Sequence, residues 1–311
     1  MVKNIRFNSL RILLFFATAM LLVNCNSAKK KTNSDAKVQD FVTQDDIFDD
    51  IDKAKKIFYS LPSPLETAML IKSAGAKYDE ELLNSMNNRS KYTTNKSMAL
   101  NLGIYTTDLS FASLFDQTQT SINYMNAARS MAEGLDIQDA IDDETLKRLE
   151  DNLSNRDVVM DIISETFLNC SSYLKENERQ DVAAIVLVGG WVEGLYLAGK
   201  LVGNSSIENN KLADRMIEQK LSFNIVQRML DDNKQNEKGV KNADIVQLMD
   251  QLKDLKIAFD KVKVVSAETT TEKNDSSNIT TLKSKTKVSV SASDFKQLQL
   301  EVDKLRTSFI H

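Results

Sequence analysis

The sequence is short of the residues that end helices and form tight turns. It contains two prolines, Pro62 and Pro64, and nine glycines in 311 residues. A β-sandwich or β-barrel needs a turn about every ten residues, so this scarcity disfavours both folds. Long helices need neither residue in their interiors. We therefore predict an all-α fold: a multi-helix bundle or a stack of antiparallel helical hairpins, remotely like tetratricopeptide repeats.

Side chains that commonly carry catalysis are also scarce. The one histidine, His311, is the last residue, where chains usually fray. This disfavours Ser-His-Asp and Cys-His triads and most zinc sites. Of the two cysteines, Cys170 falls on the apolar stripe of an expected helix, where a thiol behaves as a small hydrophobe. These residue types point to no catalytic set, metal site or cofactor, and they leave carboxylate chemistry open.

The first 24 residues have the pattern of an export signal. Three basic residues precede an apolar run over 12–23, which is too short to span a bilayer comfortably and is typical of a signal peptide. The run ends at Asn24-Cys25. This resembles a bacterial lipoprotein signal, in which the cysteine becomes the lipidated first residue, although Asn24 is larger than the usual Gly or Ala. We predict lipidation of Cys25; a non-lipidated signal peptide and an uncleaved anchor are the alternatives.

Removal of the signal would leave an acidic chain. The signal carries three of the 40 Lys and Arg residues and none of the 44 Asp and Glu residues, so the remainder has a net charge of −7. Without a concentrated basic face we expect no binding to nucleic acid, because phosphates are neutralised by clustered Lys and Arg. Residues 25–44 are polar and without apolar periodicity, and we interpret them as a flexible tether.

From residue 45 onward, apolar residues recur at helical spacing. The clearest helix follows Ser63, which forms a capping box with Glu66, while Pro64 suits the first helical position and Gly75 the end. Further helices are predicted over 45–60, 79–87, 94–114, 117–133, 142–153, 157–177, 180–202, 207–232 and 242–263. We assign 45–265 to one helical domain.

Two segments near the C-terminus repeat apolar residues with heptad spacing. Their members are Ile245, Leu248, Leu252, Leu255, Phe259 and Val262 in the first, and Phe295, Leu298, Val302, Leu305 and Phe309 in the second. Such seams pack against one another. We predict that a helix over 293–311 packs on 242–263 of the same chain, and self-association through the two seams is the alternative. The Ser, Thr and Lys-rich stretch 266–292 is expected to form a loop or a small β-hairpin.

The stretch Gly194–Lys200 has the glycine and lysine spacing of a phosphate-binding loop. Leu201 stands where such a loop needs Ser or Thr. Gly190, Gly194 and Ala198 are spaced by four and share one helical face, which lets another backbone approach. We therefore predict a closely packed helix and no nucleotide site.

A faint internal echo relates LGIY (102–105) to VGGW (188–191) at an offset of 86 residues. It matches Gly103 with Gly189 and Tyr105 with Trp191. The echo indicates either a duplicated helical hairpin or a chance match between two helical cores.

Two carboxylates lie within apolar helices. Asp108 and Glu193 would have raised pKa values there unless paired, and two facing carboxyl groups can act as an acid–base pair. With Tyr105 and Trp191 they form a candidate ligand-binding site, as in a small-ligand receptor or a carboxylate-based enzyme. The simpler interpretation is that each carboxylate bonds to a nearby hydroxyl or arginine, or lies at the edge of its stripe.

Three segments, FYSLPSPLETA (58–68), LNLGIYTTDL (100–109) and GGWVEGLY (189–196), resemble predicted lipoproteins of Bacteroidetes-type bacteria. The similarity spans about 45–265. That family has no assigned activity, so the resemblance implies export, lipidation and a helical fold only. In such bacteria surface display tends to accompany acidic residues after the lipidated cysteine, whereas 29–31 are lysines here. We therefore expect a periplasm-facing envelope protein, anchored to the membrane at Cys25, that binds an unidentified protein or envelope component.

Overall fold

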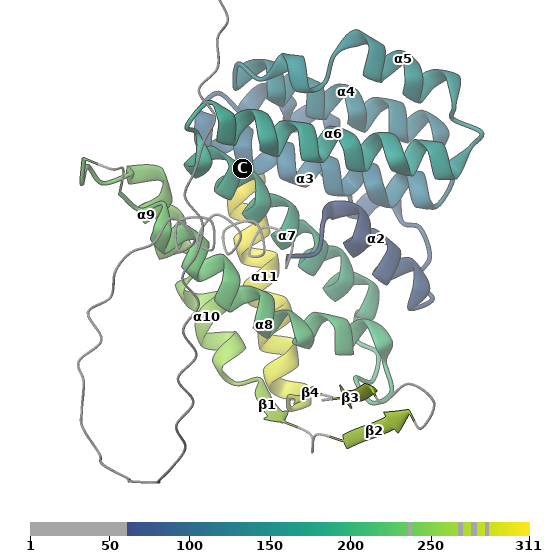
Figure 1. Cartoon of the computed structure of the whole chain (residues 1–311), viewed down its shortest axis with the longest axis vertical. Helices are drawn as coiled ribbons and strands as arrows, with labels where there is room; N and C mark the ends of the chain where they lie inside the picture. The colour runs from purple at the N-terminus through teal and green to yellow at the C-terminus, as the bar shows by residue number, and fades with distance from the viewer. Residues whose placement is uncertain (1–60, 236–237, 267–269, 275–278, 284–285) are drawn as a thin grey trace, which may run out of the picture.

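The computed structural model describes residues 61–235, 238–266, 270–274, 279–283 and 286–311. The predicted all-α fold is confirmed (Figure 1). The helices are α2 (Pro64–Ser73), α3 (Asn95–Leu114), α4 (Thr118–Gly134), α5 (Asp143–Asp151), α6 (Arg156–Glu176), α7 (Gln180–Val202), α8 (Lys211–Asp232), α9 (Ala243–Gln251), α10 (Lys253–Asp260) and α11 (Ala292–Ile310). The predicted signal peptide, the tether with Cys25 and the helix over 45–60 lie outside the described residues.

Helix α7 is the centre of the body. Helices α3, α4, α5 and α6 lie at one end of Figure 1, and α7 runs from them towards α8, α10 and α11 at the other. Of the described residues, α7 is the helix long and apolar enough to span a membrane, yet 94% of its most apolar window is buried inside the protein. Its composition is therefore that of a core helix.

Glycines set the closest contact in the core, where α3 crosses α7. A Cβ atom on Gly103 would overlap the carbonyl oxygen of Val186, and one on Gly189 would overlap that of Leu100. The two contacts are equivalent at the offset of 86 residues, because Gly103 corresponds to Gly189 and Leu100 corresponds to Val186. The sequence echo therefore reflects a local two-fold relation at the crossing of the two helices. The stretch Gly194–Lys200 is helical throughout, which is the closely packed helix expected from its sequence.

The structure corrects three of the predicted helices. Residues 79–87 form no α-helix; Asp79 and Ser85 each cap a short 3-10 turn, η1 (Glu80–Leu82) and η2 (Met86–Lys91). The helix expected from 207 begins at Lys211, because the side chain of Asn210 accepts from the first free amides. The helix expected over 242–263 is divided at Leu252, which keeps helical dihedral angles.

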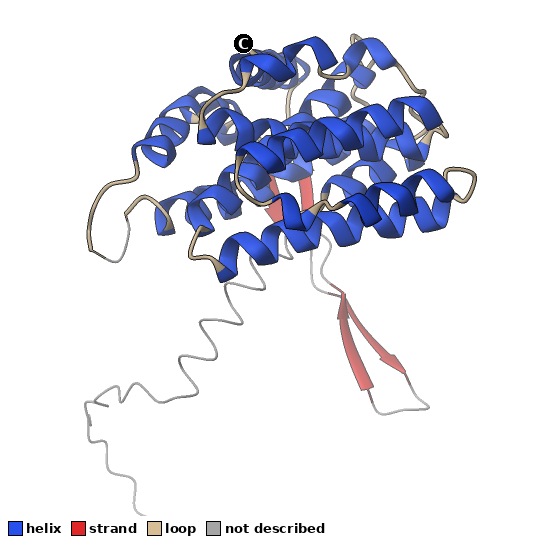
Figure 2. Cartoon of the chain, turned by 90° about the horizontal axis from the view of Figure 1, so that it is seen from above, coloured by secondary structure: helices blue, strands red, loops and turns tan. Residues whose placement is uncertain are grey.

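Two short antiparallel ladders lie between α10 and α11 in the sequence, and their strands are red in Figure 2. Strand β1 (Lys263–Ser266) pairs with β4 (Thr286–Ser289), and β2 (Thr270–Asn274) pairs with β3 (Ile279–Lys283). The segment was expected to be a loop or a hairpin, and its described parts are paired strands.

Helix α11 then returns to the body and packs against α10, α7 and α3. All eleven residues of the two heptad seams are buried within the one chain. A second copy could reach either seam only if the helices that cover it moved away.

Candidate functional site

Asp108 and Glu193 lie together in the core, and Trp191 lies elsewhere. Helix α3 carries Tyr105 and Asp108, and helix α7 carries Trp191 and Glu193. Beyond the crossing of the two helices, Asp108 comes within hydrogen-bonding reach of Glu193. The indole ring of Trp191 instead stacks on Phe223 of α8, with ring centroids 5.8 Å apart. The structure therefore does not join all four predicted residues in one site.

Helix α3 can be buried despite its polar sequence because its hydroxyl groups are satisfied within the helix. Thr106 and Ser110 donate to the carbonyl oxygens four residues earlier, at 2.7 and 2.8 Å. Thr107 does the same at 3.0 Å and also reaches the carbonyl oxygen of Gly190 on α7, at 3.2 Å. Other buried polar side chains of α3, among them Asp108 and Asn101, take partners from other elements.

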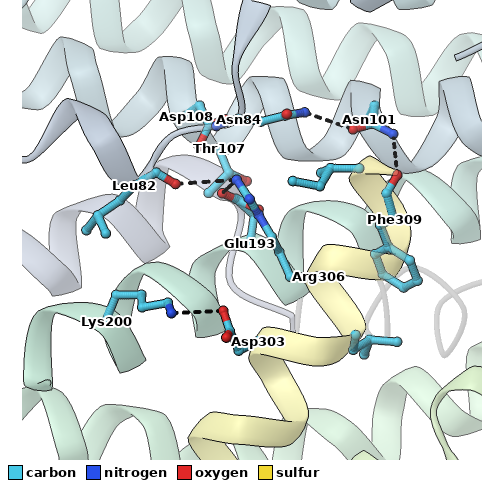
Figure 3. Close-up of polar contacts among 12 residues, drawn as sticks. Leu82, Asn84, Asn101, Thr107, Asp108, Glu193, Lys200, Asp303, Arg306 and Phe309 are labelled. Carbon is cyan, nitrogen blue, oxygen red and sulfur yellow. Dashed lines mark hydrogen bonds and ion pairs between the residues drawn. The ribbon is translucent and has the colours of Figure 1, made fainter. Parts of the chain in front are cut away.

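Arg306 of α11 is the residue that sequence reasoning missed. Its Nε and Nη2 atoms donate to the two carboxylate oxygens of Glu193, at 2.9 and 3.0 Å (Figure 3). The side chains of Arg306 and Glu193 are 7% and 0% exposed, and the guanidinium also lies 4.3 Å from the ring centroid of Tyr196. Paired geometry of this kind is among the strongest charge-assisted contacts in proteins.

This ion pair keeps Arg306 positively charged in spite of its burial. Burial disfavours the guanidinium charge, but the charge and hydrogen bonds of Glu193 outweigh burial and raise the pKa of Arg306. The simpler interpretation therefore applies to Glu193, because an arginine binds its carboxylate. Arg306 adjoins the heptad residue Leu305, but so does Lys304, and the sequence contains no signal that singles out Arg306.

Asp108 is the less satisfied of the two carboxyl groups. Its Oδ2 accepts from the backbone N–H of Asn84 at 3.0 Å, whereas its Oδ1 receives no hydrogen bond from the described residues. Burial, followed by the negative charge of Glu193, raises the pKa of Asp108 well above its ordinary value; Arg306 acts in the opposite direction. Asp108 is thus a buried carboxyl group whose ionisation is strongly disfavoured.

Amide and phenol groups extend the cluster to the end of α11. Asn84 donates to Asn101 at 3.0 Å, and Asn101 donates to the carbonyl oxygen of Phe309 at 2.9 Å (Figure 3). Tyr92 donates to the carbonyl oxygen of Ile310 at 3.3 Å. The last carbonyl groups of a helix have no partner within it, so these side chains fix the C-terminal turn of α11 to the body. Tyr105 borders this shell and donates to the carbonyl oxygen of Ser85 at 3.2 Å.

The enclosed geometry limits what this cluster can do chemically. Tyr105, Asp108 and Glu193 are each 0% exposed, so a substrate has no contact with the carboxyl pair in this conformation. Trp191 lines a separate cavity of about 30 Å³ with Thr67 and Gly194, room for about two water molecules. The arrangement is that of a buried polar network that holds α3, α7 and α11 together.

Two further features bear on chemistry. Burial raises the pKa of the Cys170 thiol to about 12, so this cysteine is a poor nucleophile near neutral pH. Across the described residues, no three side chains of the His, Cys, Asp or Glu types are grouped so that they could hold a metal ion.

Open surface depressions gather around the loop 203–210 between α7 and α8. Three clefts of about 690, 610 and 410 Å³ adjoin this loop. Glu208 lines all three, and the other lining residues include Lys77, Ser205, Asn210, Val288, Ser291 and Lys296. Within the loop, Asn209 has a left-handed backbone with φ of 56°. Unlike the carboxyl pair, this region is accessible to a partner.

Comparison of the chain with protein-family models, with curated proteins and with solved structures gives no match. The resemblance to predicted lipoproteins of Bacteroidetes-type bacteria therefore stays a prediction.

Proposed function

We propose that this protein is a lipid-anchored module of a bacterial cell envelope that faces the periplasm and binds a protein or another envelope component. The observation that carries the proposal is the apolar run 12–23, which Asn24 and Cys25 follow directly. Acylation of that cysteine would fix the chain to a membrane. A flexible chain of the length of 26–44 spans about 25 Å on average, so the helical body would act close to the bilayer.

The structure of the body favours binding over catalysis at the predicted residues. The carboxyl pair of Asp108 and Glu193 is enclosed and joined to Arg306, which gives it a stabilising role. A receptor or enzyme that uses this pair would need a conformation in which the core opens. Self-association through the heptad seams would need α11 to leave its place.

We expect the partner to bind at the three clefts around 203–210. They are open, adjoin one another at Glu208 and combine neutral polar, charged and apolar side chains. Protein surfaces that bind other molecules commonly combine a depression with a few such polar groups. The proposed surface therefore comprises this loop and the neighbouring start of α11.

Site-specific photo-crosslinking in native membranes tests this proposal. A photoreactive amino acid would replace Ser205 or Lys296, both exposed at the clefts, and in matched controls Glu150 or Asp161, exposed on α5 and α6. We expect a discrete adduct from the cleft positions only, and its loss in a Cys25→Ser background. Equal adducts from all four positions, or none from the clefts, would contradict the proposed surface.

A further inference from the structure

The core contains two carboxyl groups and one guanidinium in a region closed to water. Asp108 on α3 faces Glu193 from α7 and Arg306 from α11. The phenols of Tyr124 on α4, of Tyr78 before η1 and of Tyr105 on α3 itself also lie near it. If both carboxyl groups were ionised, the three charged side chains would carry a net negative charge inside the protein. Buried charges of that kind are strongly disfavoured unless they are paired.

The hydrogen bonds indicate which of the two carboxyl groups would take up a proton and so remove the net negative charge. Arg306 donates to both oxygens of Glu193, and Asp108 accepts from Asn84 through Oδ2 alone. Asp108 Oδ1 lacks a donor among the described residues, and a buried acceptor of this kind costs about 1–3 kcal/mol. A proton on Asp108 would provide a donor for Glu193 and would leave the cluster neutral.

We propose that Asp108 is a protonated carboxylic acid that donates a hydrogen bond to Glu193, and that loss of the proton from Asp108 releases the C-terminal turns of α11 from the body. The contacts explain why the effect would be local. The guanidinium of Arg306 is the buried ionic link from α11 to α7, and Asn84, which bonds to Asp108, also leads through Asn101 to the carbonyl group of Phe309. The inference does not depend on the proposed function.

The neighbouring phenols do not titrate in the pH range in which the proposal can be tested. Burial raises the pKa of Tyr78 to about 12, and it also raises the pKa values of Tyr105 and Tyr124. All three phenols therefore stay neutral between pH 5 and 9. The raised pKa of Asp108 places its proton loss above the range of ordinary aspartates.

Hydrogen exchange of the full chain between pH 5 and 9, corrected for the intrinsic pH dependence, measures the release. From pH 5 up to the raised pKa that Asp108 has in the native state, we expect protection of residues 302–311 to fall about tenfold per pH unit, because release costs the cluster one proton, and to level off above that pKa. Amides of α6 that exchange by local fraying should keep constant protection, because that opening leaves Asp108 buried.

Asp108→Asn is the decisive variant, since its amide can donate to Glu193 and accept from Asn84 at every pH. We expect it to keep α11 protected throughout. Asp303→Asn is the matched control: it removes the exposed ion pair with Lys200, which also joins α11 to α7, and should keep the wild-type pH dependence. Constant protection of 302–311 in the wild type, or pH dependence that persists in Asp108→Asn, would overturn the proposal.

A second measurement tests whether Asp108 is protonated even if the Asp108→Asn variant fails to fold. Infrared spectroscopy of wild-type protein with isotope-labelled aspartate should show the carbonyl band of a protonated carboxylic acid at pH 7. We expect this band to persist while the protection of α11 falls and to disappear at the pH where that protection reaches its minimum. Its absence at pH 7 would overturn the proposal without any variant.

Discussion

Replacement of Gly103 by alanine tests whether the crossing of α3 and α7 determines the packing of this core. The added Cβ atom would overlap the carbonyl oxygen of Val186 and lie 2.6 Å from the backbone nitrogen of Gly190. Both obstacles are backbone atoms of a buried helix, so no side chain can rotate away to make room. The two helices would have to separate along their most extensive contact.

The expected loss of stability follows from two opposing terms. Overpacking of a filled core costs typically about 1–3 kcal/mol, and we expect the upper end because rigid backbone is displaced. Alanine has a higher helix propensity than glycine, which offsets about 0.5–1 kcal/mol. The net loss should be about 2 kcal/mol, equivalent to a decrease in Tm of about 4–8 °C for a domain of this size.

Gly199→Ala provides a control in the same core. Its Cβ atom would lie 3.4 Å from Met216 Cε and 3.6 Å from Gln299 Cγ, at the flexible ends of side chains. We expect this variant to be as stable as the wild type or more stable by up to about 1 kcal/mol. Urea unfolding of both variants in a Cys25→Ser background, followed by far-UV circular dichroism, measures the difference. Equal stability of Gly103→Ala and Gly199→Ala would refute the reasoning.

Three further predictions concern the buried side chains. Glu193→Gln leaves the charge of Arg306 unpaired in the core and should cost about 3–5 kcal/mol in urea unfolding, whereas Asp303→Asn, which breaks an exposed pair, should cost less than about 1 kcal/mol. Because folding raises the pKa of Asp108, the wild type should lose stability relative to Asp108→Asn by about 1.4 kcal/mol per pH unit, from about pH 4 up to the folded pKa; a constant difference would contradict this. The Cys170 thiol, with its pKa raised to about 12, should react with a thiol reagent at pH 8 only after urea unfolds the protein, and rapid reaction of the native protein would disprove its burial.

Local signals predicted most helices of the described body because they depend on near neighbours. The capping box of Ser63 and Glu66 is present, with the two bonds at 3.1 and 2.7 Å. Competing caps caused two of the errors, at 79–87 and at the start of α8. The helix expected over 207–232 begins later because the Ser206 side chain accepts from the N–H of Glu208 in a local turn and Asn210 caps α8.

The polar cluster could be predicted only in part, because its contacts join distant segments. The burial of Asp108 and Glu193 follows from the apolar helices around them. The partner of Glu193 lies 113 residues later on α11, and among the Lys and Arg residues of the chain nothing in the periodicity distinguishes Arg306. Trp191 was placed beside Glu193 by sequence proximity, but two residues along a helix turn a side chain by about 200°, towards α8 rather than α3.

The most direct test of the proposed membrane anchor combines metabolic labelling with a fatty-acid analogue and fractionation of cells that express the full chain. We predict that the wild-type protein carries the label and sediments with membranes, and that Cys25→Ser carries none. Recovery of unlabelled wild-type protein in the aqueous fraction would contradict the account.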